Sequence, residues 1–256
     1  MSVFIIILLY VLFLSENITS NLPAFKDKEV FVFLWMFAGI IAVTTATATL
    51  GAYGKFIEDK VSKKSEDLLI TIMTSRQLAY SYIIYSVIVG IIFTILLLLF
   101  GYIYTLINFQ TTIHISVSLV TVIFLSIFMH TLLFYVITAN LKTMSAFSGL
   151  STIVGTLIGF LAGIYIPIGL LPSYLQKVIT LFPTTQSTLL LKDLLMKDVL
   201  EPMQHAMSNA DYHELVYMLG IELQWNGHVL TNTFSWSYLV GATIILSGVI
   251  LIKHRK

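Results

Sequence analysis

The chain of 256 residues contains no cysteine and few charged side chains. Without cysteine, disulfides, thiol catalysis and zinc sites built on cysteine are excluded. Charged residues make up 11% of the chain, whereas soluble domains carry about 25%, so a water-soluble globular protein is excluded as well. The 14 basic and 13 acidic residues leave a formal charge of +1, so there is no basic field that would attract nucleic acid.

Hydrophobic residues are abundant instead. They make up 57% of the chain and give a mean hydropathy of +0.92, which excludes intrinsic disorder. A helix crosses the hydrocarbon layer in about 20 apolar residues, and the chain is divided into segments of this kind. The sequence therefore predicts an all-α integral membrane protein, a single domain with six transmembrane helices. The predicted spans cover residues 3–14, 30–50, 78–107, 113–139, 144–171 and 233–252.

The first predicted span, residues 3–14, is short and begins almost at the start of the sequence. It lacks a basic n-region and a small-residue cleavage site, so we interpret it as a clipped first transmembrane helix rather than a signal peptide. Cytoplasmic loops are enriched in Lys and Arg, and this bias sets the orientation of the whole chain. Most basic residues lie on the inner side when both termini are cytoplasmic, and we expect this topology.

Charges are concentrated in the predicted inner segment, residues 55–77. Acidic and basic side chains alternate there, and the apolar residues Leu68, Leu69 and Ile70 follow them. This pattern predicts that the second span extends beyond the membrane, bends near residues 62–65 and continues as a short amphipathic helix along the membrane surface. A solvated loop that only fixes the orientation is the alternative.

The predicted outer segment covers residues 172–232. Pro172, Pro183 and Pro202 divide its apolar first part into runs that are too short to cross the bilayer as an antiparallel pair. We therefore expect short helices that lie in the outer leaflet or re-enter it. The second part, residues 203–228, is polar.

The fifth predicted span carries small residues spaced by four, which lie on one helix face and permit close approach of a second helix. They are Ser151, Gly155, Gly159 and Gly163. A weaker stripe of the same kind lies on the second span and consists of Ala38, Ala42 and Ala46. Such a face serves either packing within the chain or a subunit interface, and the sequence leaves both open.

His130 lies within the fourth predicted span and is the intramembrane polar candidate. An ionisable group at membrane depth is a functional candidate by default. We favour the alternative, a neutral histidine that is hydrogen-bonded to a backbone carbonyl or a hydroxyl group. No Asp, Glu, Lys or Arg lies inside the long spans, which argues against a carrier with a carboxylate relay and against a channel with a charged ring.

Motifs for catalysis and cofactor binding are lacking. Lys55 follows Gly51 and Gly54, but the sequence contains no G-x-x-x-x-G-K-[ST], so the chain cannot bind ATP phosphates by itself. There is no H-E-x-x-H and no nucleophile elbow. The outer residues Asp211, His213 and Glu214 lack the two-histidine helical spacing of a zinc site. We expect no catalytic residue, metal or cofactor in this chain.

Three stretches together resemble the permeases of ABC-2 type transporters, the membrane-spanning subunits of ATP-binding-cassette exporters. The start, SVFIIILLYVLFL, is similar to the family's first span. Residues 56–60 (FIEDK) and 67–71 (DLLIT) resemble its E-D-K … D-x-L segment after the second span. Residues 163–172 (GIYIPIGLLP) and 182–183 (FP) resemble its G-x-x-x-P … L-P … P signature, the most specific of the three.

Two features depart from the family pattern. The cytoplasmic elbow helix that precedes the first span in the family has no counterpart in this sequence, and we expect the elbow region to be missing. Ile72 stands where the family often has a proline after the D-x-L segment.

The resemblance implies an exporter in which two permease subunits, identical or different, work with separate nucleotide-binding subunits that hold ATP and Mg²⁺. It implies a multi-pass protein of a prokaryotic plasma membrane and an amphipathic cargo such as a drug, antibiotic, peptide or lipid, as in multidrug resistance. The residues expected to couple to the ATPase are Glu58, Asp59, Lys60, Glu66, Asp67, Leu68, Leu69 and Ile72. Those expected to pack helices or line the substrate route are Ser151, Gly155, Gly159, Gly163, Pro167, Pro172 and Pro183.

Other functions remain alternatives at the level of the sequence. An ATP-independent secondary carrier would depend on His130. A non-transporting immunity or sensor subunit would bind a signalling partner through its inner loop, and a truncated chain would be an inactive fragment.

Overall fold

The computed structural model describes residues 27–70, 73–225 and 227–253, with the side chain of residue 206 also left undescribed. The predicted first span, residues 3–14, and Ile72 lie outside this part. Five of the described helices are long and apolar enough to cross a membrane, which confirms an all-α membrane protein. They are α3 (Lys28–Val61), α5 (Ser75–Phe109), α6 (Val117–Thr138), α7 (Met144–Leu161) and α11 (Asn232–Lys253).

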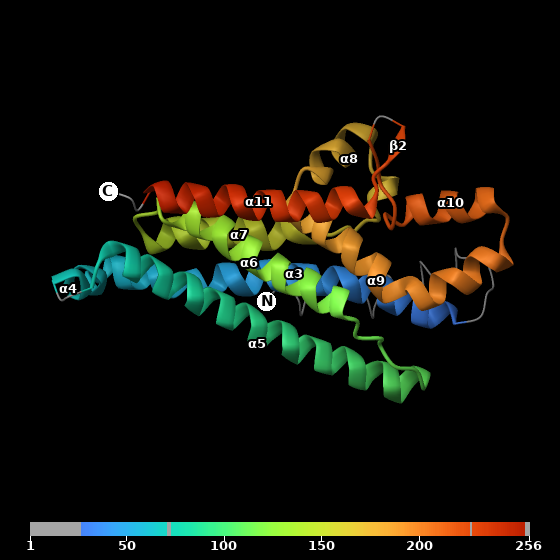
Figure 1. Cartoon of the computed structure of the whole chain (residues 1–256), viewed down its shortest axis with the longest axis horizontal. Coiled ribbons are helices and arrows are strands. Elements are labelled where there is room, and N and C mark those ends of the chain that lie inside the picture. Colours follow the sequence, from blue (N-terminus) through green and yellow to red (C-terminus); the bar gives the residue numbers. More distant parts are fainter. Residues whose placement is uncertain (1–26, 71–72, 226, 254–256) are drawn as a thin grey trace.

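The remaining described elements are α4 (Lys64–Ile70) and those between α7 and α11. At one end of the bundle α4 joins α3 to α5, and at the opposite end lie α10 and the hairpin of β1 and β2 (Figure 1). The elements between α7 and α11 are η2 (Ile168–Leu170), α8 (Ser173–Thr180), α9 (Pro183–Ala206), α10 (Asn209–Met218), β1 (Gln224–Trp225) and β2 (His228–Val229). The two strands pair antiparallel, with Gln224 opposite Val229 and Trp225 opposite His228.

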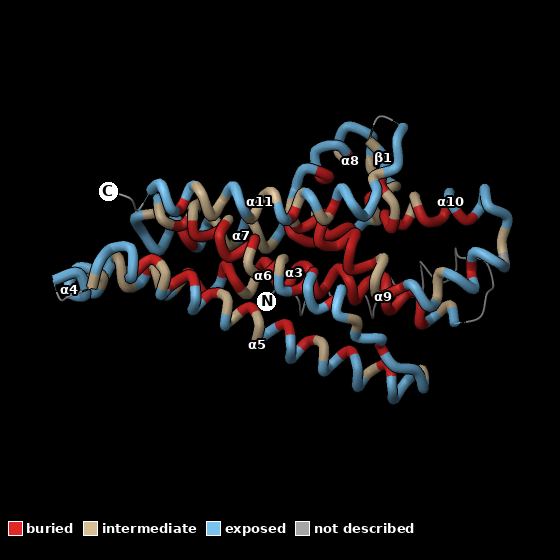
Figure 2. Tube along the Cα trace, viewed as in Figure 1, coloured by how far each residue is buried: buried red, intermediate tan, exposed pale blue. Residues whose placement is uncertain are grey.

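Helix α3 is the central element of the bundle. It packs against α5, α6, α7 and α9, and 94% of its most apolar stretch is buried, compared with 22% for α5 and 17% for α11. Small residues allow this close packing: Gly90 of α5 meets Thr49, and Gly101 of α5 meets the ring of Phe37. Figure 2 shows the buried residues gathered along α3 and the first half of α9, whereas the outer faces of α5 and α11 are exposed.

The prediction that the fifth span is helical to residue 171 is wrong, because α7 ends at Leu161. Gly163 adopts a left-handed conformation (φ 62°). Its N–H donates to the Phe160 carbonyl at 3.0 Å, and the N–H of Ile164 donates to the Gly159 carbonyl at 2.9 Å. These two bonds form the usual glycine-terminated end of a helix, and the chain then turns into η2.

The predicted extension of α3, the bend after it and a short following helix are present. The helix continues to Val61, and the chain bends at Ser62 and Lys63, of which Lys63 has a φ of 64°. Helix α4 then begins at Lys64.

Of the short helices predicted between the prolines, α8 is present, but α9 is a long helix of 24 residues because Pro202 does not interrupt it. Helix α10 lies in the polar second part, where no helix was predicted. Pro202 lies inside α9, which continues to Ala206. A proline this close to a helix end removes one backbone hydrogen bond while the remaining turns stay intact. The other prolines lie at helix starts, where the missing N–H costs no hydrogen bond. Pro167 and Pro172 directly precede η2 and α8, and Pro183 is the first residue of α9.

Candidate functional site

Helix α4 is the most exposed helix at its end of the bundle. None of its seven residues is buried, and the side chains of Leu69 and Ile70 are 39% and 83% exposed. Glu66 and Asp67 lie in its first turn, where negative side chains interact favourably with the positive end of the helix dipole. Among the described elements, α4 packs mainly against α3 and α5. It projects from the bundle (Figure 1). An acidic and apolar helix thus faces outward at this end.

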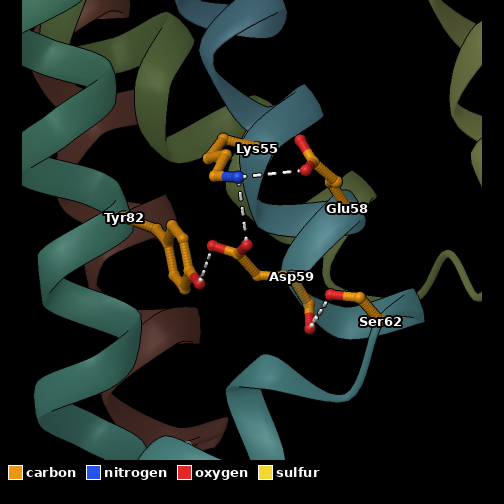
Figure 3. A network of polar contacts seen from close by, with 5 residues as sticks. All are labelled: Lys55, Glu58, Asp59, Ser62 and Tyr82. Carbon is orange, nitrogen blue, oxygen red and sulfur yellow. Dashed lines mark hydrogen bonds and ion pairs between the residues drawn. The ribbon is translucent and has the colours of Figure 1, made fainter.

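Asp59, which we expected to couple to an ATPase, is bonded within the chain (Figure 3). Its carboxylate accepts a hydrogen bond of 2.9 Å from the hydroxyl of Tyr82 on α5. Lys55 lies 3.3 Å from the same carboxylate and 3.1 Å from that of Glu58. Asp59 therefore fixes the end of α3 to α5.

Lys60 is also turned toward the bundle. Its amine donates to the carbonyls of Ala139 and Leu141, at 3.0 and 2.8 Å, in the turn that follows α6. Lys253 of α11 donates to the side chain of Asn140 in the same turn at 3.2 Å. Positive side chains are favourable at a helix C-terminus, where carbonyls lack intrahelical partners. The turn between α6 and α7 is therefore tied to both α3 and α11.

The predicted coupling residues thus fall into two groups. Those on α3 include Asp59 and Lys60, whose charged groups have partners inside the chain. Those on α4 are exposed: Glu66, Asp67, Leu68 and Leu69. The exposed group is the one available to another protein.

His130 of α6 lies fully inside the bundle. Its Nδ1 is 2.8 Å from the carbonyl of Ser126, and its Nε2 is 2.9 Å from the hydroxyl of Thr184 on α9. Thr45 of α3 lies 3.4 Å from Nδ1. A neutral histidine that donates from Nδ1 and accepts at Nε2 satisfies both nitrogens. This is the arrangement of a hydrogen-bonded structural histidine.

The start of α9 makes further buried hydrogen bonds to three other helices. Ser126 of α6 donates to Ser187 at 2.9 Å, and Ser235 of α11 donates to Gln186 at 2.7 Å. The hydroxyl of Thr185 is 2.8 Å from the carbonyl of Leu161, the last residue of α7. The sequence signal for this cluster, which our sequence analysis missed, is the polar run at residues 184–188 directly after a proline.

The small residues of α7 have different surroundings. Gly159 is buried, and a side chain there would collide with the ring of Tyr165. Gly163 forms the turn after the helix. Ser151 and Gly155 are half-buried. The C-terminal half of this set, Gly159 and Gly163, is therefore used for packing and turning within the chain.

Lys192 of α9 is completely buried. Its amine donates to the carbonyls of Leu219 and Gly220, at 3.1 and 3.2 Å. It also lies 4.6 Å from the centre of the Trp35 ring of α3. The sequence is compatible with this burial, because Lys192 directly follows the apolar run at residues 189–191 and precedes another at 194–196.

Helix α10 has one buried and one exposed face. Tyr212, Leu215 and Val216 are buried, and burial raises the pKa of the Tyr212 phenol. Asp211 accepts a hydrogen bond of 2.7 Å from Ser208 at the start of the helix. His213 lies on the exposed face, 3.7 Å from Glu222. Among the residues that the structure describes, no three metal-binding side chains come together.

These features define a multi-pass α-helical membrane protein with a short exposed helix at one end and a buried, polar helix start at the centre. The model of the ABC-2 family transporter proteins matches residues 13–252. The chain belongs to this family and is a permease of the ABC-2 type. Comparison with curated proteins and with solved structures gave no match.

Proposed function

We propose that this chain is the membrane-spanning subunit of an exporter that is powered by ATP hydrolysis on a separate subunit. The observation that carries the proposal is the exposed surface of α4. Leu69 and Ile70 stay exposed there, whereas the charged groups of Asp59 and Lys60 on the preceding helix are bonded within the chain. An apolar surface bordered by acidic residues suits a protein interface with a polar rim.

Helix α4 would bind in a groove of the nucleotide-binding subunit. Glu66 and Asp67 would fix the register through charge, and Leu69 and Ile70 would supply buried apolar contact. Movement of the ATPase would reach α3 and α5 directly, because both are joined to α4. No ATPase chemistry is assigned to this chain, and ATP and Mg²⁺ would be held by the partner.

The remaining arrangement follows from this assignment. With α4 in the cytoplasm, α10 and the hairpin face outward, and residues 3–14 supply a sixth span. Two permease subunits, identical or different, would enclose the path in a prokaryotic plasma membrane. In the described parts of the five apolar helices, charged side chains occur only near the ends, so an amphipathic cargo with large apolar surface is favoured over an ion.

Purification of the tagged chain from its native membrane in mild detergent tests the proposal. We expect an ATPase to co-purify and the eluate to hydrolyse ATP. The double substitution Leu69→Arg and Ile70→Arg should remove the ATPase without lowering the amount of permease in the membrane. Val229→Arg, at a half-exposed position at the other end of the molecule, is the matched control.

Two results would refute the proposal. One is a pure permease without ATPase activity under conditions that preserve other membrane complexes. The other is equal ATPase capture by the α4 double variant and by the Val229→Arg control.

A further inference from the structure

The carbonyl of Leu219, just after the last residue of α10, is a meeting point of three helices. It accepts hydrogen bonds from the indole N–H of Trp35 on α3 at 2.8 Å and from the amine of Lys192 on α9 at 3.1 Å. The same amine donates to Gly220 at 3.2 Å. Carbonyls at a helix C-terminus have no intrahelical partner and carry partial negative charge. Lys192 therefore caps α10 from a neighbouring helix.

The opposite side of this helix end is held as well. Gly169 of η2 lies so close to the backbone of Tyr217 and Met218 that no side chain would fit. The hydroxyl of Tyr217 donates to Gln176 of α8 at 2.8 Å. The end of α10 is thus held between α3 and α9 on one side and the turn after α7 on the other.

We call residues 207–225 and 227–230, which contain α10 and the two strands, the outer cap. Its described helix has a buried face of Tyr212, Leu215 and Val216. The cap lies at the end of the molecule opposite α4 (Figure 1). Its direct polar links to α3 and α9 at this helix end are those of Trp35 and Lys192.

A buried amine is an unusual choice for static packing. Burial of a polar group costs free energy unless hydrogen bonds offset it, and an apolar side chain of similar length would avoid this cost. The amine and the carbonyls can, however, exchange their mutual bonds for bonds to water when they separate, so the net free-energy change is small. A contact of this kind suits a surface that opens and closes.

We propose that Lys192 is a positioning residue of the external gate, whose bonds to Leu219 and Gly220 hold the outer cap closed against the start of α3 and the middle of α9. This inference rests on the proposed function, in which the cap faces the outside. Loss of these bonds shifts the equilibrium toward an open cap without unfolding the bundle.

Thiol labelling tests the inference directly, because the chain has no cysteine of its own. The reporter is Val216→Cys, at a position that is 1% exposed on the buried face of α10. Its reaction with a maleimide is followed in detergent-solubilised permease. Lys192→Met should raise the labelling rate by about tenfold, the size expected for the loss of buried hydrogen bonds. Lys197→Met, at an exposed position of the same helix, should leave the rate unchanged.

Two further variants separate an opened cap from an unfolded protein. Trp35→Phe keeps an aromatic ring but removes the N–H bond to Leu219, and it should also raise labelling of the Val216→Cys reporter. Ser86→Cys reports on the buried contact between α5 and α3. Its thiol should stay protected in the Lys192→Met background. Equal labelling of Val216→Cys in the Lys192→Met and Lys197→Met proteins, or labelling of Ser86→Cys along with it, would overturn the inference.

The gate role has its own readout. In the complex with the ATPase, addition of ATP should raise the labelling rate of Val216→Cys in the protein with native Lys192, and no change would overturn this role. Labelling of the permease alone does not depend on ATPase capture. A failure of the proposed function is therefore distinguishable from a failure of Lys192 to hold the outer cap closed.

Discussion

His130 of α6 and Thr184 of α9 share a hydrogen bond of 2.9 Å inside the bundle. The second nitrogen of His130 contacts the carbonyl of Ser126 one turn earlier in its own helix. Nε2 thus joins α6 to α9, and Nδ1 has its partner within α6. A secondary carrier needs an ionisable group that exchanges protons or ions with its surroundings, and these contacts give His130 a structural role instead.

Substitution of His130 distinguishes the two roles. His130→Gln can still bond to Thr184, so we expect normal ATPase activity of the complex and a nearly unchanged unfolding temperature. His130→Leu leaves buried partners unsatisfied and should lower the free energy of unfolding by about 1–3 kcal/mol. Thermal unfolding in detergent gives the comparison. Complete loss of transport in His130→Gln, with stability preserved, would restore the carrier hypothesis.

Lys60 should contribute to stability rather than to ATPase binding. Lys60→Met removes the bonds to the carbonyls of Ala139 and Leu141 and should lower the free energy of unfolding by about 1–2 kcal/mol. Capture of the ATPase should be unchanged. Lys64→Met, at an exposed position of α4, is the control for stability. If Lys60→Met abolishes capture and leaves stability intact, the lysine belongs to the interface.

Gly163 should tolerate no side chain. Because its φ is 62°, Gly163→Ala should cost about 1–2 kcal/mol from backbone strain alone. Gly248→Ala in α11 has open space around the added methyl group and should be neutral or slightly stabilising. Unfolding temperatures of the two variants provide the test. Equal stability would show that α7 ends differently from the turn described above.

Thr185 and Thr188 form a matched pair on α9, since both are buried. The hydroxyl of Thr185 bonds to the carbonyls of Leu161 and Ile179. Among the described residues, that of Thr188 bonds to the carbonyl of Thr184 in its own helix. Thr185→Val should lower the free energy of unfolding by about 1–2 kcal/mol. Thr188→Val should have a much smaller effect, because its helix keeps the main-chain bonds. A reversed order would contradict the assigned role of the helix start.

Much of the fold could be predicted from the sequence. The five described membrane-length helices were each predicted, because each contains an apolar run about as long as the 20 residues that cross the hydrocarbon layer. The bend after α3 followed from the concentration of charge. The end of α7 was predicted too late, although Gly163 and Pro167 are the residue types that stop helices. A hydropathy argument counts apolar residues and does not register a left-handed glycine.

The partners of polar residues could not be predicted. Asp59 and Lys60 occur in a charged run that suggests a solvated surface, but their partners, Tyr82 and the turn after α6, are distant in sequence. The burial of Lys192 could not be predicted for the same reason. Its partners, Leu219 and Gly220, come together with it only once α10 has packed. Which charges are buried depends on tertiary contacts, whereas composition indicates only how many there are.

The central position of α3 also predicts how the gene tolerates variation. Residues 30–46 of α3 are all buried, and the helix packs against α5, α6, α7 and α9, so a bulkier side chain in this stretch displaces a neighbour. The exposed faces of α5 and α11 need only remain apolar, and many residues satisfy that condition. A saturation mutagenesis screen should therefore show residues 30–46 of α3 as the least permissive stretch around the whole circumference, and α5 and α11 as permissive on their exposed side.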